Sequence, residues 1–149
     1  MFRHNITRVV GIDVAIDPVA AGATDANGKV IDTLGYESIA FAINIGTITS
    51  TAVTGLKIQS GALANGSDMA DVAGSAVAIA DTQSNKVAWS AEVHRPSKRY
   101  VRVVVTRATA NAVVAGGVAI LGRAGYQPAA AGANQAATTP AVPPVLLNA

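Results

Sequence analysis

The sequence predicts an all-β fold: a jelly-roll-like antiparallel β-sandwich followed by an extended C-terminal arm. Hydrophobic residues alternate with a period of two along most of the chain, which is typical of strands that bury one face. Residues that favour turns recur about every eight to twelve positions between these runs. No stretch has the length and the period of about 3.6 residues of a substantial helix. About seven or eight short strands of this kind are typical of a sandwich or a jelly roll.

The length of 149 residues fits a single domain. We place the β-sandwich in residues 1–126 and the arm in residues 127–149. Cysteine is absent, which excludes a disulfide framework, a thiolate metal site and a thiol nucleophile. No apolar run approaches the ~20 residues that span a bilayer, and the chain opens on no signal-peptide pattern. We therefore expect a soluble protein with no membrane partner.

The first half of the chain holds the clearest strand, at residues 39–45. Its large side chains share one predicted inner face: Ile39, Phe41, Ile43 and Ile45. Residues 6–16 predict an earlier strand and residues 30–31 a short one. Between these two, Asn27-Gly28 is a strong tight-turn signal.

The second half supplies the remaining strands, predicted at 56–59, 75–79, 87–93, 99–107 and 113–121. Their predicted inward side chains are Leu56, Ile58, Val87, Trp89, Val93, Val101, Val103 and Val105. The last run is apolar almost throughout, as in a buried strand, and Gly116-Gly117 predicts a bulge in it. The segments with loop composition are 65–68, 81–85 and 95–98.

Charge is distributed unevenly along the chain. All nine acidic residues lie at or before Glu92; with the five basic residues of that part they sum to −4, and the six basic residues that follow sum to +6. One interpretation is that the basic part associates with an acidic neighbour. The other is that folding brings the two parts together and removes the asymmetry.

The basic residues gather most closely at Arg95, Lys98, Arg99 and Arg102, next to His94. We favour a contact with an acidic protein surface. A strand edge protected from aggregation by its charges is the second interpretation. Nucleic acid is the least favoured partner, because Tyr100 is the one exposed ring expected nearby for stacking on bases.

Signatures of catalysis and of cofactor binding fail. The two histidines, His4 and His94, have no nucleophile elbow to serve. The segment 116–122 is glycine-rich but lacks the Lys-Ser/Thr of a phosphate loop. The early aspartates Asp13, Asp17, Asp25 and Asp32 do not have calcium-loop spacing. We expect no enzymatic activity, no cofactor and no metal.

The C-terminal segment 127–149 has its own composition, without a single charge. Pro140, Pro143 and Pro144 favour an extended polyproline-like backbone. The segment then reaches the apolar group Val145-Leu146-Leu147. We favour an arm that docks on a neighbouring subunit over a disordered tail, because disordered segments are usually charged.

Several short motifs carry a resemblance to a known family. They are Gly35-Tyr36-Glu37-Ser38, Phe41-Ala42-Ile43-Asn44-Ile45-Gly46, Lys57-Ile58-Gln59, Lys98-Arg99-Tyr100-Val101-Arg102-Val103, Ala119-Ile120-Leu121-Gly122 and Pro128. Across residues 34–128 the chain resembles the small capsid cement, or decoration, proteins of tailed phages and prophages, most closely those of Bordetella podophages.

The resemblance implies a structural protein of the virion exterior, made in the bacterial host cytoplasm. It also implies a jelly-roll-like subunit that forms a homodimer and binds the major capsid protein, with no catalytic residues to carry over. The interface residues that we expect are Arg95, Lys98, Arg99, Arg102, Val145, Leu146 and Leu147. The alternative is a tail-tube or head–tail connector subunit. A carbohydrate-binding sandwich is less favoured, since aromatic residues make up only 4% of the chain.

Overall fold

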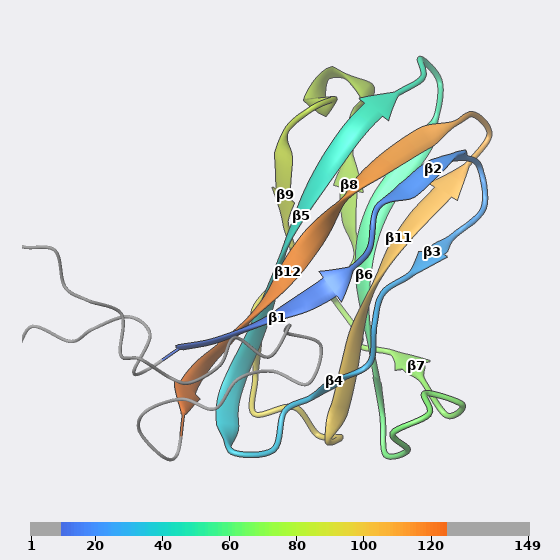
Figure 1. Cartoon of the computed structure of the whole chain (residues 1–149). Helices are drawn as coiled ribbons and strands as arrows, with labels where there is room; N and C mark the ends of the chain where they lie inside the picture. The colour runs from blue at the N-terminus through green and yellow to red at the C-terminus, as the bar shows by residue number, and fades with distance from the viewer. Residues whose placement is uncertain (1–9, 125–149) are drawn as a thin grey trace, which may run out of the picture.

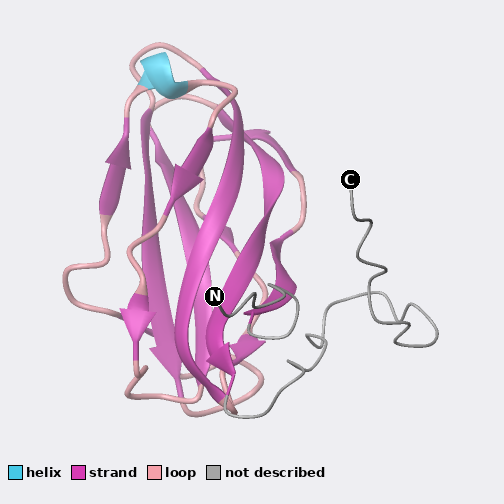
Figure 2. Ribbon diagram, turned by 90° about the vertical axis from the view of Figure 1, so that its left-hand side faces the viewer, coloured by secondary structure: helices cyan, strands magenta, loops and turns pink. Residues whose placement is uncertain are grey.

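The structure, a computed structural model, describes residues 10–124. These residues form strands joined by loops, with one short 3-10 turn, η1 (Asp81–Gln83), among them (Figures 1 and 2). The strands are β1 (Val10–Ile16), β2 (Val19–Gly22), β3 (Ala26–Asn27), β4 (Ile31–Asp32), β5 (Tyr36–Ile48), β6 (Val53–Gly61), β7 (Ala70–Asp71), β8 (Val77–Ile79), β9 (Val87–Trp89), β10 (Val93–His94), β11 (Tyr100–Ala108) and β12 (Ala112–Ala124).

The strands form two antiparallel sheets that pack face to face (Figure 1). In sheet A, β12 and β5 are central, with β1 and β2 along one edge and β9 and β10 along the other. In sheet B, β11 and β6 are central, with β3 and β4 along one edge and β7 and β8 along the other. When the two strands of each edge are taken together, the chain passes from one sheet to the other at every connection except the one from β6 to β7. This is the strand order of a jelly roll, so the predicted antiparallel β-sandwich is confirmed. The arm predicted at residues 127–149 lies outside the described residues.

The central strands are long and the edge strands are interrupted. β5 and β12 have 13 residues each, and β6 and β11 have 9 each. Each edge instead consists of two short strands in succession along the same central neighbour. Pro18 separates β1 from β2 and has no N–H to donate to a ladder. Short, broken edges limit uncontrolled pairing with other chains.

The core lies between the two sheets and follows the predicted alternation. The predicted inward side chains of the central strands are all buried: Ile39, Phe41, Ile43, Ile45, Leu56, Ile58, Val101, Val103 and Val105. The bulge predicted at Gly116-Gly117 is also present, because the pairing of β12 with β5 shifts between Val114 and Gly116. Gly116 has a φ of 109°, a conformation that favours glycine.

The prediction for residues 87–93 was wrong in part. Val87 and Trp89 face outward, and Ala88 packs against the core in their place. Trp89 pairs with Ala42 while Val93 pairs with Ile39, so this edge has one residue more than β5 over the same span. The extra residue reverses the facing between β9 and β10, and Val93 packs against the core as predicted.

The tight turn predicted at Asn27-Gly28 was also wrong. Asn27 belongs to β3, and the chain runs on along β11 into β4. The glycine serves a close approach, because a Cβ on Gly28 would lie 2.6 Å from the carbonyl oxygen of Ala15 and 2.7 Å from that of Val103. The last strand extends to Ala124, beyond the predicted end at 121. Residues 6–9 of the predicted first strand lie outside the described residues.

Candidate protein-interaction site

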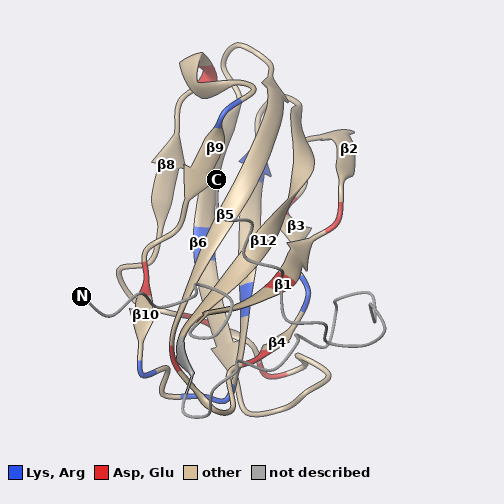
Figure 3. Cartoon of the chain, turned by 60° about the vertical axis from the view of Figure 1, so that its left-hand side comes forward, with Lys and Arg blue, Asp and Glu red and all other residues tan. Residues whose placement is uncertain are grey.

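The outer face of sheet A is apolar across three neighbouring strands. We call it the apolar face and define it by Ile12, Val14, Ala40, Ala42, Val118 and Ile120. The pairing sets these residues in two rows, Ile12–Ile120–Ala40 and Val14–Val118–Ala42. Ile12 is 46% exposed and Val118 is 39% exposed. In Figure 3 the middle parts of β5 and β12 carry neither blue nor red.

The sequence of β12 explains this face. Its inward residues Ala119 and Leu121 are buried, but the residues between them, Val118 and Ile120, are apolar as well. A strand with one face in water normally alternates apolar and polar residues, whereas a strand covered on both faces reads as a continuous apolar run. The pattern of β12 therefore suits a strand that is covered on its second face as well, which residues 10–124 leave open.

The outer face of sheet B is polar by contrast. Arg102 Nε donates to Gln59 Oε1 over 2.8 Å, and Gln59 Nε2 donates to Asp71 Oδ1 over 2.6 Å. Lys57 Nζ lies 3.1 Å from the other carboxylate oxygen of Asp71. The hydrogen bond from Gln59 and then that from Lys57 lower the pKa of the Asp71 carboxyl. This network joins β11, β6 and β7 on a surface that suits water.

The predicted basic cluster is divided between a loop and a sheet. Arg95, Lys98 and Arg99 lie in the loop that joins β10 to β11, whereas Arg102 lies on the outer face of sheet B. Arg95 has a φ of 48°, and its backbone N–H donates to the carbonyl of Glu37 over 2.6 Å. The structure thus fixes the backbone of this loop against β5 and keeps Arg102 apart from it.

Folding pairs one member of the cluster with the acidic half of the chain. Arg99 donates to both carboxylate oxygens of Asp32, from Nε over 2.8 Å and from Nη2 over 2.6 Å. This contact lowers the pKa of the Asp32 carboxyl and raises that of the guanidinium. Arg99 also lies 5.2 Å from the centroid of the Tyr100 ring. For Arg99, the interpretation that folding removes the charge asymmetry is therefore correct.

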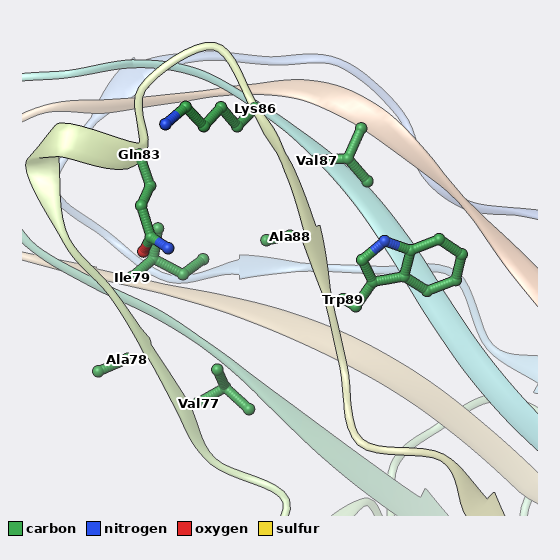
Figure 4. A pocket seen from close by; sticks show the side chains of 8 residues that line it. All are labelled: Val77, Ala78, Ile79, Gln83, Lys86, Val87, Ala88 and Trp89. Atoms are coloured by element: carbon green, nitrogen blue, oxygen red, sulfur yellow. The ribbon is translucent and has the colours of Figure 1, made fainter.

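A second surface feature, which the sequence prediction missed, is a groove at the side of the sandwich. We call it the edge groove, because it lies between β8, an edge strand of sheet B, and β9, an edge strand of sheet A (Figure 4). Its volume is about 210 Å³. The lining residues are Val77, Ala78, Ile79, Gln83, Lys86, Val87, Ala88 and Trp89. The outward facing of Trp89, 58% exposed, could be found only by knowing the extra residue in this edge.

The loop above the edge groove, between β8 and β9, is held by its own side chains. The backbone N–H of Ile48 donates to Ser84 Oγ over 3.0 Å, and the N–H of Asn85 donates to the carbonyl of Gly46 over 3.0 Å. Gln83 Oε1 accepts a hydrogen bond from the N–H of Ala80 over 2.9 Å. These bonds attach the loop to β5, so one end of the groove has a defined shape.

Within residues 10–124, no three histidine, aspartate or glutamate side chains gather as they would around a metal ion. His94 is exposed on β10, and His4 lies outside the described part of the chain. The structure contains no helix, over the residues it describes, that is long and apolar enough to cross a membrane. The predicted interface residues Val145, Leu146 and Leu147 also lie outside the described residues.

Comparison with models of known protein families and with curated proteins found no match to this chain.

Proposed function

We propose that the chain is a structural virion protein that binds the outside of a tailed-phage capsid and stabilises it by bridging major capsid protein subunits. The observation that carries the proposal is the contrast between the two outer faces of the sandwich. Sheet B presents Lys57, Asp71 and Arg102 in a polar network, whereas sheet A presents the apolar face. A sandwich surrounded by water normally has polar residues on its outer faces, and exposed apolar patches mark interaction sites.

A shell-binding subunit needs one adhesive face and one face that suits water, and this sandwich has both. The apolar face supplies area without charge, and the loop of Arg95, Lys98 and Arg99 adds basic groups that would orient attachment to an acidic shell. A standard protein interface buries about 1,200–2,000 Å². Repeated over many sites, such contacts add stability to the particle without any chemical step. The motifs that resemble those of capsid cement proteins support the same function, with self-association into a homodimer as part of it.

The experiment that tests the proposal measures the chain in particles purified from the phage or prophage that encodes it. Quantitative mass spectrometry should find the chain in a fixed ratio to the major capsid protein over the whole shell. Particles without the chain should still assemble but should break at a lower temperature or on osmotic shock. A small ring of fixed copy number would instead support a tail-tube or connector subunit. Absence from particles, or unchanged particle stability, would overturn the proposal.

A matched pair of variants connects this test to the apolar face. Val118→Asp places a charge in the middle of that face and should lower occupancy on particles. Val53→Asp places the same charge on a valine at the start of β6 that is 63% exposed and lies outside the apolar face. It should leave occupancy unchanged. Equal occupancy of the two variants would show that the apolar face is not the attachment surface.

A further inference from the structure

The edge groove is open at a side of the sandwich where neither β8 nor β9 has a further described strand beside it. Its walls come from both sheets: Val77 and Ile79 on β8 point toward Ala88 on β9 (Figure 4). The side chains of Val87 and Trp89 extend from the other side of β9, at the rim of the groove. Ile79 is buried, while Val77, Val87 and Trp89 are 38%, 55% and 58% exposed. Large aromatic residues at a concave apolar surface are enriched where proteins bind partners. The groove therefore has the composition of a binding site for an apolar segment.

The polar groups of the edge groove are hydrogen-bond donors. The indole Nε1–H of Trp89 and the ammonium of Lys86 have no acceptor function. Gln83 Oε1 already accepts from the N–H of Ala80, which leaves its NH₂ group to donate. No Asp or Glu lines the groove. A complementary ligand is apolar, carries no positive charge and presents carbonyl oxygens, as a proline-rich segment does because proline has no N–H.

We propose that residues 140–147 of a second copy of the chain bind in this groove. Their sequence is Pro-Ala-Val-Pro-Pro-Val-Leu-Leu, within a segment that has no charge from residue 127 to residue 149. Pro140 and Pro143 are three positions apart, so a polyproline helix of about three residues per turn places both on one side. Grooves lined by aromatic residues recognise proline-rich segments with this spacing. Val145 and Leu146 add apolar surface for Val77 and Ala88.

The position of the described chain end favours a second copy over the same copy. β12 ends at Ala124, and β5 lies between β12 and β9 in sheet A. Because β5 lies between them, a segment that crosses sheet A from Ala124 to the groove of the same copy would pass over the outer surface of β5, which the proposed function assigns in part to the capsid; at this step the inference rests on that function. At ~3.1 Å per residue, the segment between Ala124 and Pro140 can span about 50 Å, which is enough to reach a neighbouring sandwich.

Tryptophan fluorescence reports on the edge groove alone, because Trp89 is the only tryptophan in the sequence. The full chain is studied from about 0.1 to about 100 μM by tryptophan emission and by sedimentation velocity. We expect emission to move to shorter wavelength as concentration rises, in step with association. Val145→Asp should weaken association about tenfold or more. At concentrations where the emission of the unmodified chain has moved to shorter wavelength, the variant should still emit as an exposed indole does. Ala130→Asp, which adds the same charge to the same segment outside residues 140–147, should behave as the unmodified chain.

A second variant separates the groove from other association. Trp89→Ser should weaken sedimentation-detected association as much as Val145→Asp, and the two together should weaken it no further, because both remove one contact. A shift of emission that Val145→Asp removes but that does not depend on concentration would mean binding within one copy and would overturn the proposal. Tryptophan emission that is the same with and without Val145→Asp at every concentration would also overturn the proposal.

The particle measurement keeps this inference distinct from the proposed function. If the chain is absent from particles while its self-association depends on Trp89 and Val145, the proposed function fails and the groove contact stands. If the chain decorates particles but its emission does not respond to Val145→Asp, the proposed function stands and the groove contact fails.

Discussion

Arg107 Nε donates to the carbonyl oxygen of Thr24 over 2.7 Å, within the sandwich and not on its surface. The same side chain, only 5% exposed, donates from Nη1 to the carbonyls of Ala20 and Ala112 over 2.9 Å each. One guanidinium therefore joins β2, the connection from β2 to β3 and the start of β12. It closes the end of the core where the edge strands of the two sheets separate.

This arrangement predicts that Arg107→Met destabilises the fold. Methionine keeps the apolar stem but leaves the carbonyls of Ala20, Thr24 and Ala112 without their donor. We expect the free energy of unfolding to fall by about 1–3 kcal/mol, measured by urea denaturation. Arg102→Met is the control, because Arg102 donates on the outer face of sheet B, and it should change stability by less than about 0.5 kcal/mol. Equal losses in the two variants would contradict this role for Arg107.

A second prediction concerns Gly28, where an added side chain would clash with the neighbouring backbone. A Cβ at this position would meet the backbone carbonyl oxygens of Ala15 and Val103 at 2.6 and 2.7 Å, and neither can move without its strand. Gly28→Ala should therefore lower the free energy of unfolding by about 1–3 kcal/mol. Gly35→Ala is the comparison, because Gly35 has a φ of 88° but nothing within 4 Å of an added Cβ. It should cost about 1 kcal/mol, from backbone strain alone. A neutral Gly28→Ala in urea denaturation would show that the two strands separate readily there.

Sequence alternation predicted the core positions of β5, β6 and β11 well, because β6 and β11 pair without a shift and the bulge beside β5 lies in β12. Ile39, Phe41 and Ile43 lie in one uninterrupted stretch of β5, so a period of two was enough to identify the core. The edge was different. Trp89 faces outward because of an extra residue between β9 and β10. That residue is recognised only by comparison with the neighbouring strand β5, which is distant in sequence: Phe41 and Ser90, which are hydrogen-bonded there, are 49 positions apart. Local patterns contain no information about such distant pairing.

The candidate site was predicted less completely than the fold, for a related reason. Arg99 was grouped with Arg95 and Lys98 by sequence, but its partner Asp32 is 67 positions away. The apolar face had a local signal, since the last strand is apolar at Val118 and Ile120 as well as at its buried positions. That signal indicated a strand buried on both faces, and the structure shows that the described chain covers only one.

Acid should destabilise the fold through three carboxyl groups. The pKa of Asp32 is lowered by Arg99, that of Asp68 by the backbone N–H of Ala62, and that of Asp71 by Gln59. A carboxyl whose pKa is lower in the folded than in the unfolded state stabilises the fold above the unfolded pKa of about 3.9. This stabilisation is lost as the pH falls through the folded pKa, because the unfolded chain then binds more protons.

We therefore expect the urea midpoint to decline from about pH 5 downward and to continue falling to about pH 3. Asp68→Asn is the informative variant, since its amide oxygen can still accept the N–H groups of Ala62 and Leu63 but does not titrate over this range. Its decline should be shallower than that of the unmodified chain. Parallel declines would mean that Asp68 contributes nothing to the acid response.

The basic residues lead to a prediction about attachment to particles. If Arg95 and Lys98, in the loop between β10 and β11, face acidic residues of the capsid, Arg95→Glu with Lys98→Glu should slow attachment while the isolated domain stays folded, as checked by circular dichroism. Attachment of the unmodified chain should also weaken at high salt, because charges at the rim of an interface mainly affect association rate and salt dependence. Lys29→Glu, on a residue that pairs with Asp17 away from the loop, is the control. Identical occupancy of all three proteins at every salt concentration would rule out an electrostatic contribution.

Truncation after Tyr126 separates the fold of the chain from its association. The last described strand pair is Ala124 with Tyr36, so every strand pair that the structure describes lies before residue 127. The free energy of unfolding of the truncated chain, from urea denaturation, should therefore lie within about 0.5 kcal/mol of that of the full chain. The truncated chain should lose the contacts of Val145, Leu146 and Leu147 with a neighbour. Burying each of those side chains would contribute about 1.5–3 kcal/mol, so occupancy on particles at equal concentration should drop about tenfold or more. If the truncated chain does not fold, the segment belongs to the core of its own domain; if it decorates particles as fully as the complete chain, the segment has no part in attachment.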